Sequence, residues 1–328
     1  MVRLLLYEWC CSGGLPEPQM NNSHTAFIKE GRMMLEALAV DAARDKTIAV
    51  TVLVGSGQFI SLPMHITIEK VPSRKDIEFL IHQSQQADYT IIVAPETDGI
   101  LTNYVTHVRE RSSTVIAPGE EFLRLASDKQ QTVNALAAFG VPVPAGRILD
   151  GGEVIPEHFY FPAICKSRAS AGCDTLSILH NDKRAFIFQA PVRLERYHSG
   201  VPVGVSCLCG NHLEILPPML QHFSNDPSPR YVRSEPLKNC YLVSRAQSLA
   251  RRSIIALEKA SSDFASGWIG VDMILGTRTD GSDDRVLEVN PRLTSSFVEH
   301  SRNTEKSLVR SMIDSTISSR EATTATCH

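Results

Sequence analysis

Short apolar runs alternate with amphipathic stretches through residues 1–118. Runs rich in aliphatic and β-branched residues indicate strands, and apolar residues that recur every three or four positions indicate helices. The alternation favours an open, mostly parallel sheet with helices on its faces. The first turn lacks the Gly-x-Gly-x-x-Gly fingerprint, so we expect a Rossmann-like unit without a dinucleotide. The predicted strands are 2–7, 48–54, 89–93 and 115–117, and the predicted helices are 25–43, 73–87 and 98–111.

The pattern changes after residue 118. One or two helices are expected over 119–139, closed by Gly-Val-Pro-Val-Pro at 140–144. Both the glycine and the prolines disfavour continuation of a helix. A smaller strand-rich unit then extends to about residue 200. Its predicted elements are strands at 145–149, 162–167, 174–178 and 191–197, with a helix near 181–189.

A long helix over 241–262 is flanked by two strand-rich segments, 201–216 and 267–290. The segment 217–240 is dense in Pro, Ser, Asn, Asp and Arg, which predicts a long loop of the kind that is usually functional or disordered. The Ser/Thr-rich end from residue 314 predicts a frayed tail. We therefore expect a combined α/β and α+β protein. Its predicted divisions are 1–118, 119–200, 201–313 and a tail over 314–328.

Composition and charge narrow the class of protein. The 328 residues are 43% hydrophobic and carry a formal net charge of −3, so the chain has no bulk attraction to nucleic acid or to an anionic membrane. No apolar run is as long as a membrane span, and the N-terminus becomes acidic too early for a signal peptide. The eight cysteines show no zinc spacing and no small-domain disulfide pattern, which favours a cytoplasmic protein. Cys207 and Cys209 are expected to pack in a core.

Two apolar strands towards the C-terminus carry the most informative polar pattern. Asp272 lies in Gly-Val-Asp-Met-Ile-Leu, and Glu288 and Asn290 lie in Leu-Glu-Val-Asn-Pro-Arg. Residues two apart on a strand share a face, so pairing of the two strands would gather two carboxylates and an amide oxygen. Such oxygens can hold Mg²⁺ against phosphates, and Arg292 would add a planar cation. The alternative is a solvated sheet face with a chance Glu-x-Asn.

Three features further upstream favour a nucleotide site. Asp128-Lys129 opens a helix, with Ser127 as the expected N-cap. Lys166 ends an apolar strand before the small-residue loop 167–173, where backbone N–H groups could approach phosphate oxygens. A lysine before such a loop is also common in a simple hairpin. Residues 194–197 lead into a strand that enters the next unit.

The order and spacing of these features resemble the ATP-grasp superfamily over about residues 119–312. The resemblance implies a Rossmann-like pre-ATP-grasp domain followed by a two-subdomain ATP-grasp fold. It also implies ATP as cofactor, with two Mg²⁺ ions, or Mn²⁺, at the metal face. The implied phosphate ligands are Lys129 and Lys166, and the implied lid residues are Ser170, Ala171 and Gly172. The implied adenine contacts are Glu195, Arg196 and Tyr197. The implied metal ligands are Asp272, Glu288 and Asn290, and the implied catalytic residues are Arg292 and Lys166.

Two positions depart from the superfamily pattern. Many members carry an acidic residue for the ribose hydroxyls where this chain has Pro202, and an arginine where it has Gly270. One ribose contact and one phosphate contact would therefore be missing. Arg230 and Arg233, in the predicted long loop, could supply the positive charge. A solvated basic loop is the alternative interpretation.

The N-terminal unit permits a narrower resemblance. Leu-Leu-Tyr-Glu-Trp at 5–9, Ser-Gly-Gly at 12–14 and Val-Ala-Pro-Glu-Thr-Asp-Gly-Ile-Leu at 93–101 are similar to the tyramine–glutamate ligase family. That family makes an early intermediate of methanofuran, a one-carbon carrier. Glu8 and Glu96 lie just past strand ends, the edge where ligands bind in such sheets, and would suit a primary amine. For Asp98, capping of the next helix is the favoured role.

The combined interpretation is an ATP-dependent carboxylate–amine ligase that forms an acyl-phosphate. Such an enzyme depends on charge neutralisation and alignment rather than on a nucleophilic side chain. Its partners would be small molecules, an amino acid and an amine, and a homodimer is one option for its assembly. Two alternatives stay open: an ATP-grasp kinase that phosphorylates a small molecule, and a nucleotide-binding regulatory protein without turnover.

Overall fold

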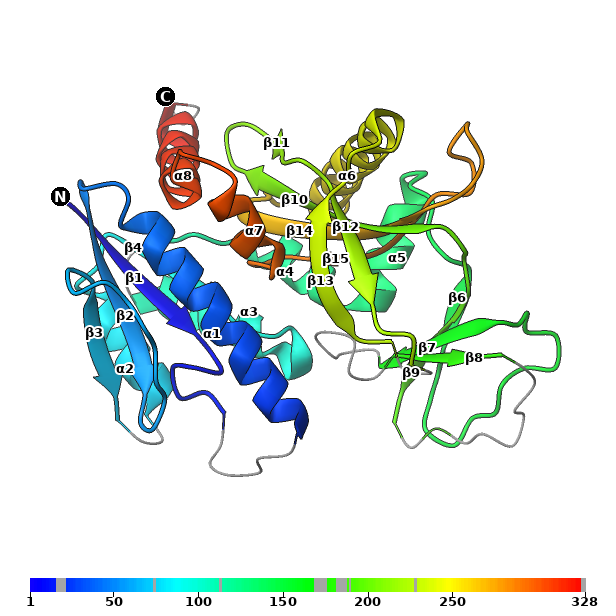
Figure 1. The fold of residues 1–328 in the computed structure, drawn as a ribbon, viewed down its shortest axis with the longest axis horizontal. Helices are drawn as coiled ribbons and strands as arrows, with labels where there is room; N and C mark the ends of the chain where they lie inside the picture. The colour runs from blue at the N-terminus through cyan, green and yellow to red at the C-terminus, as the bar shows by residue number, and fades with distance from the viewer. Residues whose placement is uncertain are drawn as a thin grey trace.

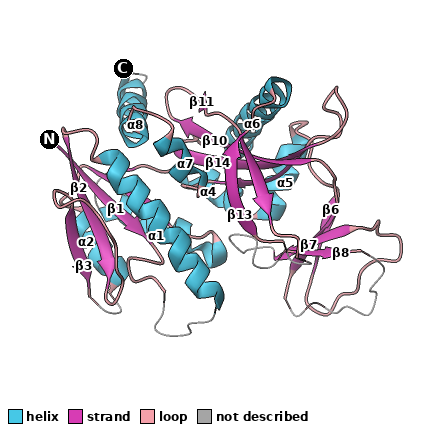
Figure 2. Cartoon of the chain, viewed as in Figure 1, coloured by secondary structure: helices cyan, strands magenta, loops and turns pink. Residues whose placement is uncertain are grey.

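The computed structural model describes residues 1–15, 22–72, 75–111, 114–167, 176–180, 188, 190–226 and 229–325. The described chain forms three β-sheets with flanking helices (Figure 1). A parallel sheet lies at one end of the molecule, a small antiparallel sheet lies at the other, and a larger antiparallel sheet lies between them (Figure 2). The expected combination of α/β and α+β architecture is confirmed.

The N-terminal domain is a five-stranded parallel sheet with helices on both faces. Its elements are β1 (Val2–Glu8), α1 (Asn22–Ala42), β2 (Ile48–Gly55), β3 (Thr67–Val71), α2 (Asp76–Ser84), β4 (Tyr89–Val93), the 3₁₀ turn η1 (Thr97–Gly99), α3 (Ile100–Arg111) and β5 (Thr114–Val115). Leu4 and Leu6 of β1 pack with α1, whereas Leu5 and Tyr7 pack with α2 and α3. Strands buried on both faces appear as continuous apolar runs, which explains why the sequence predicted this sheet.

The strand order β3-β2-β1-β4-β5 places a switch point between β1 and β4. Ligands of open α/β sheets bind outside the carboxyl ends of the strands at such a point. Glu8 is the last residue of β1, and Glu96 follows the end of β4. Both carboxylates therefore lie at the sheet edge where a substrate was expected. The edge strand β3 was not predicted, because most of its residues are exposed and its apolar pattern is weak.

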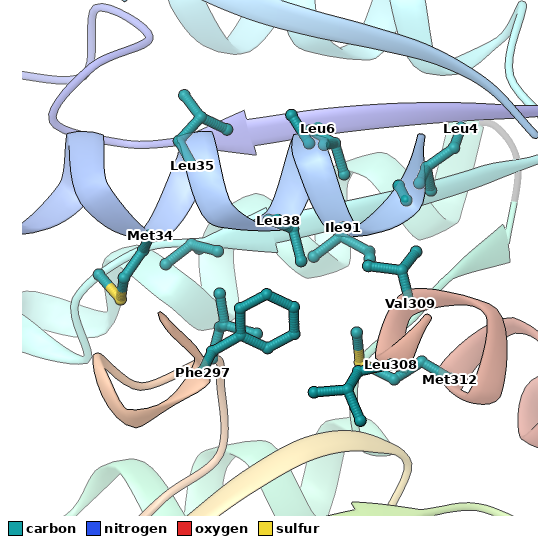
Figure 3. Packing of buried hydrophobic residues seen from close by; sticks show 14 of the residues in the cluster. Leu4, Leu6, Met34, Leu35, Leu38, Ile91, Phe297, Leu308, Val309 and Met312 are labelled. Carbon is teal, nitrogen blue, oxygen red and sulfur yellow. The ribbon is translucent and has the colours of Figure 1, made fainter. Parts of the chain in front are cut away.

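The C-terminal helices pack back onto the N-terminal domain. They are α7 (Ser296–Arg302) and α8 (Leu308–Ala325). Phe297 and Val309 join Leu38 of α1 and Ile91 of β4 in one buried cluster (Figure 3). Helix α8 continues to Ala325, through the stretch from residue 314 for which a frayed tail was expected.

Two helices and a small sheet form the next part of the chain. The elements are α4 (Glu120–Ser127), α5 (Lys129–Ala138), β6 (Gly146–Leu149), β7 (Ala163–Ser167), β8 (Ser177–Leu179) and β9 (Val192–Arg196). The antiparallel order is β6-β9-β7-β8, and the sheet has a hydrophobic cluster of its own. We call it the lid sheet. The helix predicted near 181–189 lies outside the described residues apart from position 188.

The central sheet completes the fold. Its elements are β10 (Val201–Cys209), β11 (Glu214–Ile215), β12 (Met219–Phe223), β13 (Tyr231–Pro236), α6 (Cys240–Ser261), β14 (Gly267–Leu275) and β15 (Arg285–Asn290). The main order is β13-β12-β10-β14-β15, with β11 paired to β10. Helix α6 covers one apolar face, where Cys207 and Cys209 are core residues as predicted. The opposite face carries the polar residues of the candidate site.

The predicted long loop over 217–240 was wrong in part, because residues 219–223 and 231–236 form the β12–β13 pair. Edge strand β13 exposes Arg233 and ends at Pro236, and both features resemble loop composition. No helix in the described part of the chain is long and apolar enough to span a membrane.

Candidate active site

Strands β14 and β15 bring the candidate metal ligands onto one face of the central sheet. Asp272 lies directly opposite Glu288, and Gly270 lies opposite Asn290. Opposed residues of an antiparallel pair share a face, as do residues two apart on one strand. The two carboxylates and the amide are therefore neighbours. The strand pairing on which the metal prediction depended is present in the structure.

Two amides hold the carboxylate of Asp272. Asn290 Nδ2 donates to Oδ2 at 2.9 Å, and Gln221 Nε2 donates to Oδ1 at 2.7 Å. Gln221 reaches this carboxylate across Gly204, where a Cβ would lie 2.8 Å from Gln221 Nε2. Sequence reasoning missed Gln221 because it lies in the segment predicted as a loop. Residues 219–223 show no alternation of apolar and polar side chains, so the sequence carries no clear strand signal for Gln221.

The two carboxylates of this face influence each other. Burial, together with the negative charge of Glu288, raises the pKa of Asp272 to about 7. Desolvation also opposes ionisation of Glu288, but the positive charges of Lys129 and Lys166 outweigh it and lower the pKa of that carboxyl. Glu288 is therefore the carboxylate that stays charged most readily.

A hard divalent cation fits this set of donors. Two carboxylates and the free amide oxygen of Asn290 are the ligand types that Mg²⁺ and Mn²⁺ prefer. Burial and the neighbouring charge of Glu288 both disfavour the ionised form of Asp272, and a bound cation would offset both effects. Across the described residues, no group of three or more His, Cys, Asp or Glu side chains is placed to hold a metal ion.

Lys129 lies at the start of α5, beside Glu288. Its Nζ is 3.5 Å from Glu288 Oε2, and its side chain is 12% exposed. Asp128, rather than the predicted Ser127, is the N-cap, since its Oδ1 accepts from the backbone N–H groups of Gln130 and Gln131. Ser127 instead donates to a carbonyl of α4. The cap fixes the first turn of α5 and so places Lys129 over the metal face.

Lys166 is buried between the lid sheet and the central sheet. Its Nζ lies 3.0 Å from Glu195 Oε1 and donates to the carbonyl oxygen of Leu287 at 3.2 Å. Arg193 also contacts Glu195, with 2.5 Å between Nε and Oε1. Leu287 precedes Glu288, so the lysine reaches the edge of the metal face. Sequence reasoning missed Arg193, because a charged residue on a short strand gives no signal of burial.

The other predicted nucleotide contacts lie at the outer end of β9. Arg196 and Tyr197 are exposed, and the guanidinium of Arg196 lies 5.4 Å from the centre of the Tyr160 ring. Exposed side chains agree with a hinge that would contact adenine through backbone groups, and this role stays a prediction. The predicted lid residues Ser170, Ala171 and Gly172 lie outside the described residues.

Arg292 links the central sheet to the N-terminal domain. Its Nε lies 2.8 Å from Glu96 Oε1, and its Nη2 donates to Glu96 Oε2 at 3.1 Å. The two side chains are 14% and 7% exposed. One hydrogen bond and one charge contact thus join the two groups. The switch point of the parallel sheet therefore faces the sheet that carries the candidate metal ligands.

Glu8 lies deeper in the same region. It is 3% exposed and accepts the backbone N–H of Cys11 at 2.8 Å. Burial raises the pKa of its carboxyl, against the hydrogen bonds from Cys11 and Cys10. Asp98 is exposed in η1, directly before α3, where a negative charge is favoured, so its capping role stays a prediction.

A cleft of about 490 Å³ opens between α3 and the helices α4 and α5. It shares Glu96 and Ser127 with a narrow inner cavity that reaches Lys129, Glu288 and Asn290. The cleft therefore adjoins the residues of the metal face. It is lined by Glu96, Asp98, Gly99, Thr102, Asn103, Thr106, His107, Arg124, Ser127, Asp128 and Gln131.

Arg233 is not brought to this site. It lies opposite His222, whereas Gln221 lies opposite Ser234, so Arg233 projects from the other face of the β12–β13 pair. Its Nη1 pairs with Glu235 at 2.8 Å. Arg230 is exposed, and its backbone N–H donates to Ser224. Arg233 therefore does not supply positive charge at the metal face, and the role of Arg230 stays a prediction.

The structure also explains the departure at position 270. A Cβ on Gly270 would lie 2.7 Å from Cγ2 of Thr294. No side chain fits there unless Thr294 moves. The space that an arginine would need is thus already filled in this chain.

A lid sheet that faces a carboxylate-bearing sheet across two lysines is the arrangement of an ATP-grasp protein. The chain belongs to this family. The model of the ATP-grasp domain matches residues 126–296, and that of the pre ATP-grasp 3 domain matches residues 56–121. The two models cover the parallel sheet in part and most of the lid and central sheets.

Solved structures share this fold. A protein from Archaeoglobus fulgidus assigned to the ATP-grasp superfamily is 19% identical with a TM-score of 0.71, covering 96% of this chain and 89% of that one. N5-carboxyaminoimidazole synthetase from Staphylococcus aureus, complexed with ADP, is 14% identical with a TM-score of 0.66, covering 96% and 76%. D-alanine–D-alanine ligase from Bacillus anthracis, complexed with ATP, is 15% identical with a TM-score of 0.63, covering 98% and 99%. At these identities the likeness shows the fold.

Proposed function

We propose that this protein is an ATP-dependent ligase that joins a carboxylate to an amine through an acyl-phosphate. The contact between Arg292 and Glu96 carries this proposal. It joins the metal-bearing sheet to the switch point of the N-terminal domain, so a phosphorylated acid and an amine could meet there. Two of the structurally similar proteins that bind ATP or ADP are a ligase and a synthetase, which supports the same reaction class.

The proposed reaction has two chemical steps. A carboxylate oxygen attacks the γ-phosphorus of ATP, the bond to the bridging oxygen breaks, and ADP leaves an acyl-phosphate behind. The amine nitrogen then attacks the acyl carbon, inorganic phosphate leaves, and the nitrogen loses a proton. Lys129 and Lys166 would neutralise phosphate charge, and Arg292 would orient the acyl-phosphate.

The metal ligands in this proposal are Asp272, Glu288 and Asn290, with Glu288 shared by two ions. Bound Mg²⁺ or Mn²⁺ would add positive charge at the phosphate oxygens. Glu288 is well suited to this role because its neighbouring lysines favour its charged form. Gln221 would keep the Asp272 carboxylate in place from the opposite side.

For the substrates we propose glutamate and tyramine. The likeness of residues 5–14 and 93–101 to tyramine–glutamate ligases supports this choice, and it would assign the protein to methanofuran synthesis and one-carbon metabolism. The buried carboxylates Glu8 and Glu96 suit a cationic amine at the switch point. The cleft between α3 and α4–α5 would admit it to Glu96.

A screen for ADP release tests the function. Purified protein is given MgATP with pairs of acids and amines, beginning with glutamate and tyramine, and the product is identified by mass. ADP release that needs both partners, with formation of the amide, supports the ligase. ADP release with no need of an amine would favour a kinase. Nucleotide binding without release for any pair would favour a regulatory protein.

A further inference from the structure

Two cationic side chains lie opposite each other on neighbouring strands of the lid sheet. Lys166 on β7 lies directly opposite Arg193 on β9. Like charges in directly opposed positions destabilise a sheet unless a counter-charge lies between them. Glu195, two residues further along β9 and on the same face, supplies that charge. Its Oε1 lies 3.0 Å from Lys166 Nζ and 2.5 Å from Arg193 Nε.

This trio is almost fully buried. The side chains of Lys166, Arg193 and Glu195 are 9%, 1% and 3% exposed. A buried guanidinium is tolerated only when its donors are paired. Arg193 also donates to the side-chain oxygen of Gln130 and, at 3.4 Å, to the carbonyl oxygen of Pro144. Its partners come from β9, from α5 and from the segment between α5 and β6, so Arg193 is fixed from three directions.

We propose that Arg193 is a positioning residue that stays paired with Glu195 and thereby leaves Lys166 free to move onto the nucleotide phosphates. This inference rests on the phosphate role proposed for Lys166. The trio carries one more positive than negative charge, and the surplus is available to an anion. Because Gln130 follows Lys129, the same arginine also holds the turn that carries the second lysine of the phosphate side.

Arg193 is needed because Lys166 must break two contacts before it can bind the nucleotide. To bind a phosphate oxygen, its ammonium leaves Glu195 Oε1 and the carbonyl oxygen of Leu287. If Lys166 were the sole partner of Glu195, that movement would leave a buried carboxylate without a counter-charge. With Arg193 in place, Glu195 keeps a charged partner throughout. Arg193 therefore acts on nucleotide binding through Lys166.

Calorimetric titration of the whole protein with MgATP, and separately with adenosine, tests the proposal. Arg193→Met should weaken MgATP binding at least about tenfold and leave adenosine binding within about threefold. Lys166→Ala should weaken MgATP binding as well. In the Lys166→Ala background, Arg193→Met should cause no further loss. Arg147→Met, on an exposed position of the neighbouring strand β6, is the matched control and should bind both ligands normally.

The double variant Arg193→Met/Glu195→Gln covers the case in which Arg193→Met does not fold. It removes both the charge that would hold Lys166 and the buried cation opposite it, so MgATP binding should return to within about threefold of normal. A tenfold loss in this double variant would overturn the proposal, as would additive losses of Arg193→Met in the Lys166→Ala background. Equal losses for adenosine and MgATP would show that Arg193 only maintains the fold. No loss in Lys166→Ala would refute the phosphate role itself, and the inference with it.

Discussion

Two buried carboxylates on either side of the metal face are neutralised in different ways. Glu195 shares one oxygen between two cations, Lys166 and Arg193. Glu96 has a two-point contact with Arg292 alone among the described residues. The first arrangement leaves a surplus of positive charge, and the second is balanced as a pair. The two sides of the site are therefore prepared for ligands of different charge.

The surroundings extend this difference. Lys129 contacts Glu288, and its neighbour Gln130 bonds to Arg193, so Lys129 adds positive charge close to the first arrangement. On the other side, Arg292 also interacts electrostatically with Glu30, and Glu8 is buried nearby at the same sheet edge. A polyphosphate would be attracted to the first region and an ammonium group to the second. In the proposed reaction, the side with more cations than carboxylates would hold the polyphosphate. The side with more carboxylates than cations would hold the amine.

The largest effect is expected where the two regions meet. Glu288→Gln should keep the fold but reduce ATP turnover to less than about a tenth, a loss of more than ~1.4 kcal/mol, because an amide cannot neutralise two metal ions. Turnover is measured as ADP release, and the melting temperature checks the fold. Glu214→Gln, exposed on β11 of the same sheet, is the control. Turnover above a tenth would show that Glu288 is not the shared metal ligand.

Glu96→Gln tests the balanced side. It leaves Arg292 without its charged partner and removes the carboxylate proposed for the amine, so amine binding should weaken by ~2–5 kcal/mol. MgATP binding should change little. Calorimetric titration with tyramine measures the effect, with Glu110→Gln on the exposed face of α3 as control. Equal tyramine affinity in both variants would contradict the amine role of Glu96.

Lys166→Ala tests the positive side in steady-state kinetics. The KM for ATP should rise about tenfold or more, equivalent to ~1.4 kcal/mol, while the KM for the amine stays near normal. Without nucleotide the melting temperature should change little, because Arg193 still neutralises Glu195. Together with Glu96→Gln this tests whether the two regions act separately. A rise of both KM values in either variant would mean that they do not.

The smallest effect concerns the missing arginine at position 270. Gly270→Ala should destabilise the protein by about 1 kcal/mol, because the new Cβ would lie 2.7 Å from Cγ2 of Thr294. Chemical unfolding measures this change. Thr294→Ser removes that methyl group, so adding it to Gly270→Ala should recover part of the loss. Full stability of Gly270→Ala alone would show that the space is not limiting.

Sequence reasoning succeeded where an apolar pattern and a polar pattern coincided. The shared face of Asp272, Glu288 and Asn290 was predicted because these residues alternate with core residues on strongly apolar strands, and their metal role stays a prediction. The parallel sheet was predicted because its strands are buried on both sides. In both cases local residue order alone determined which side chains would share a face.

The rest depended on contacts between distant segments. Gln221 and Arg193 lie 51 and 63 residues from Asp272 and Gln130, which they contact. A sequence gives no register between such segments, so neither residue stood out. Strand β13 was missed because a solvated edge tolerates Arg233 and Pro236, which are also typical of loops. The C-terminal helix was missed because serine and threonine outnumber the residues that anchor it.

The helices after β15 determine which parts of the molecule can move. Phe297 of α7 and Val309 of α8 share one hydrophobic cluster with the N-terminal sheet and with Trp268 of the central sheet. The lid sheet has a separate cluster around Cys165 and Leu194. Opening the first interface would expose a continuous core to water, whereas tilting the lid sheet would leave both cores intact. We therefore expect the N-terminal and central sheets to behave as one rigid platform, with closure over a nucleotide confined to the lid.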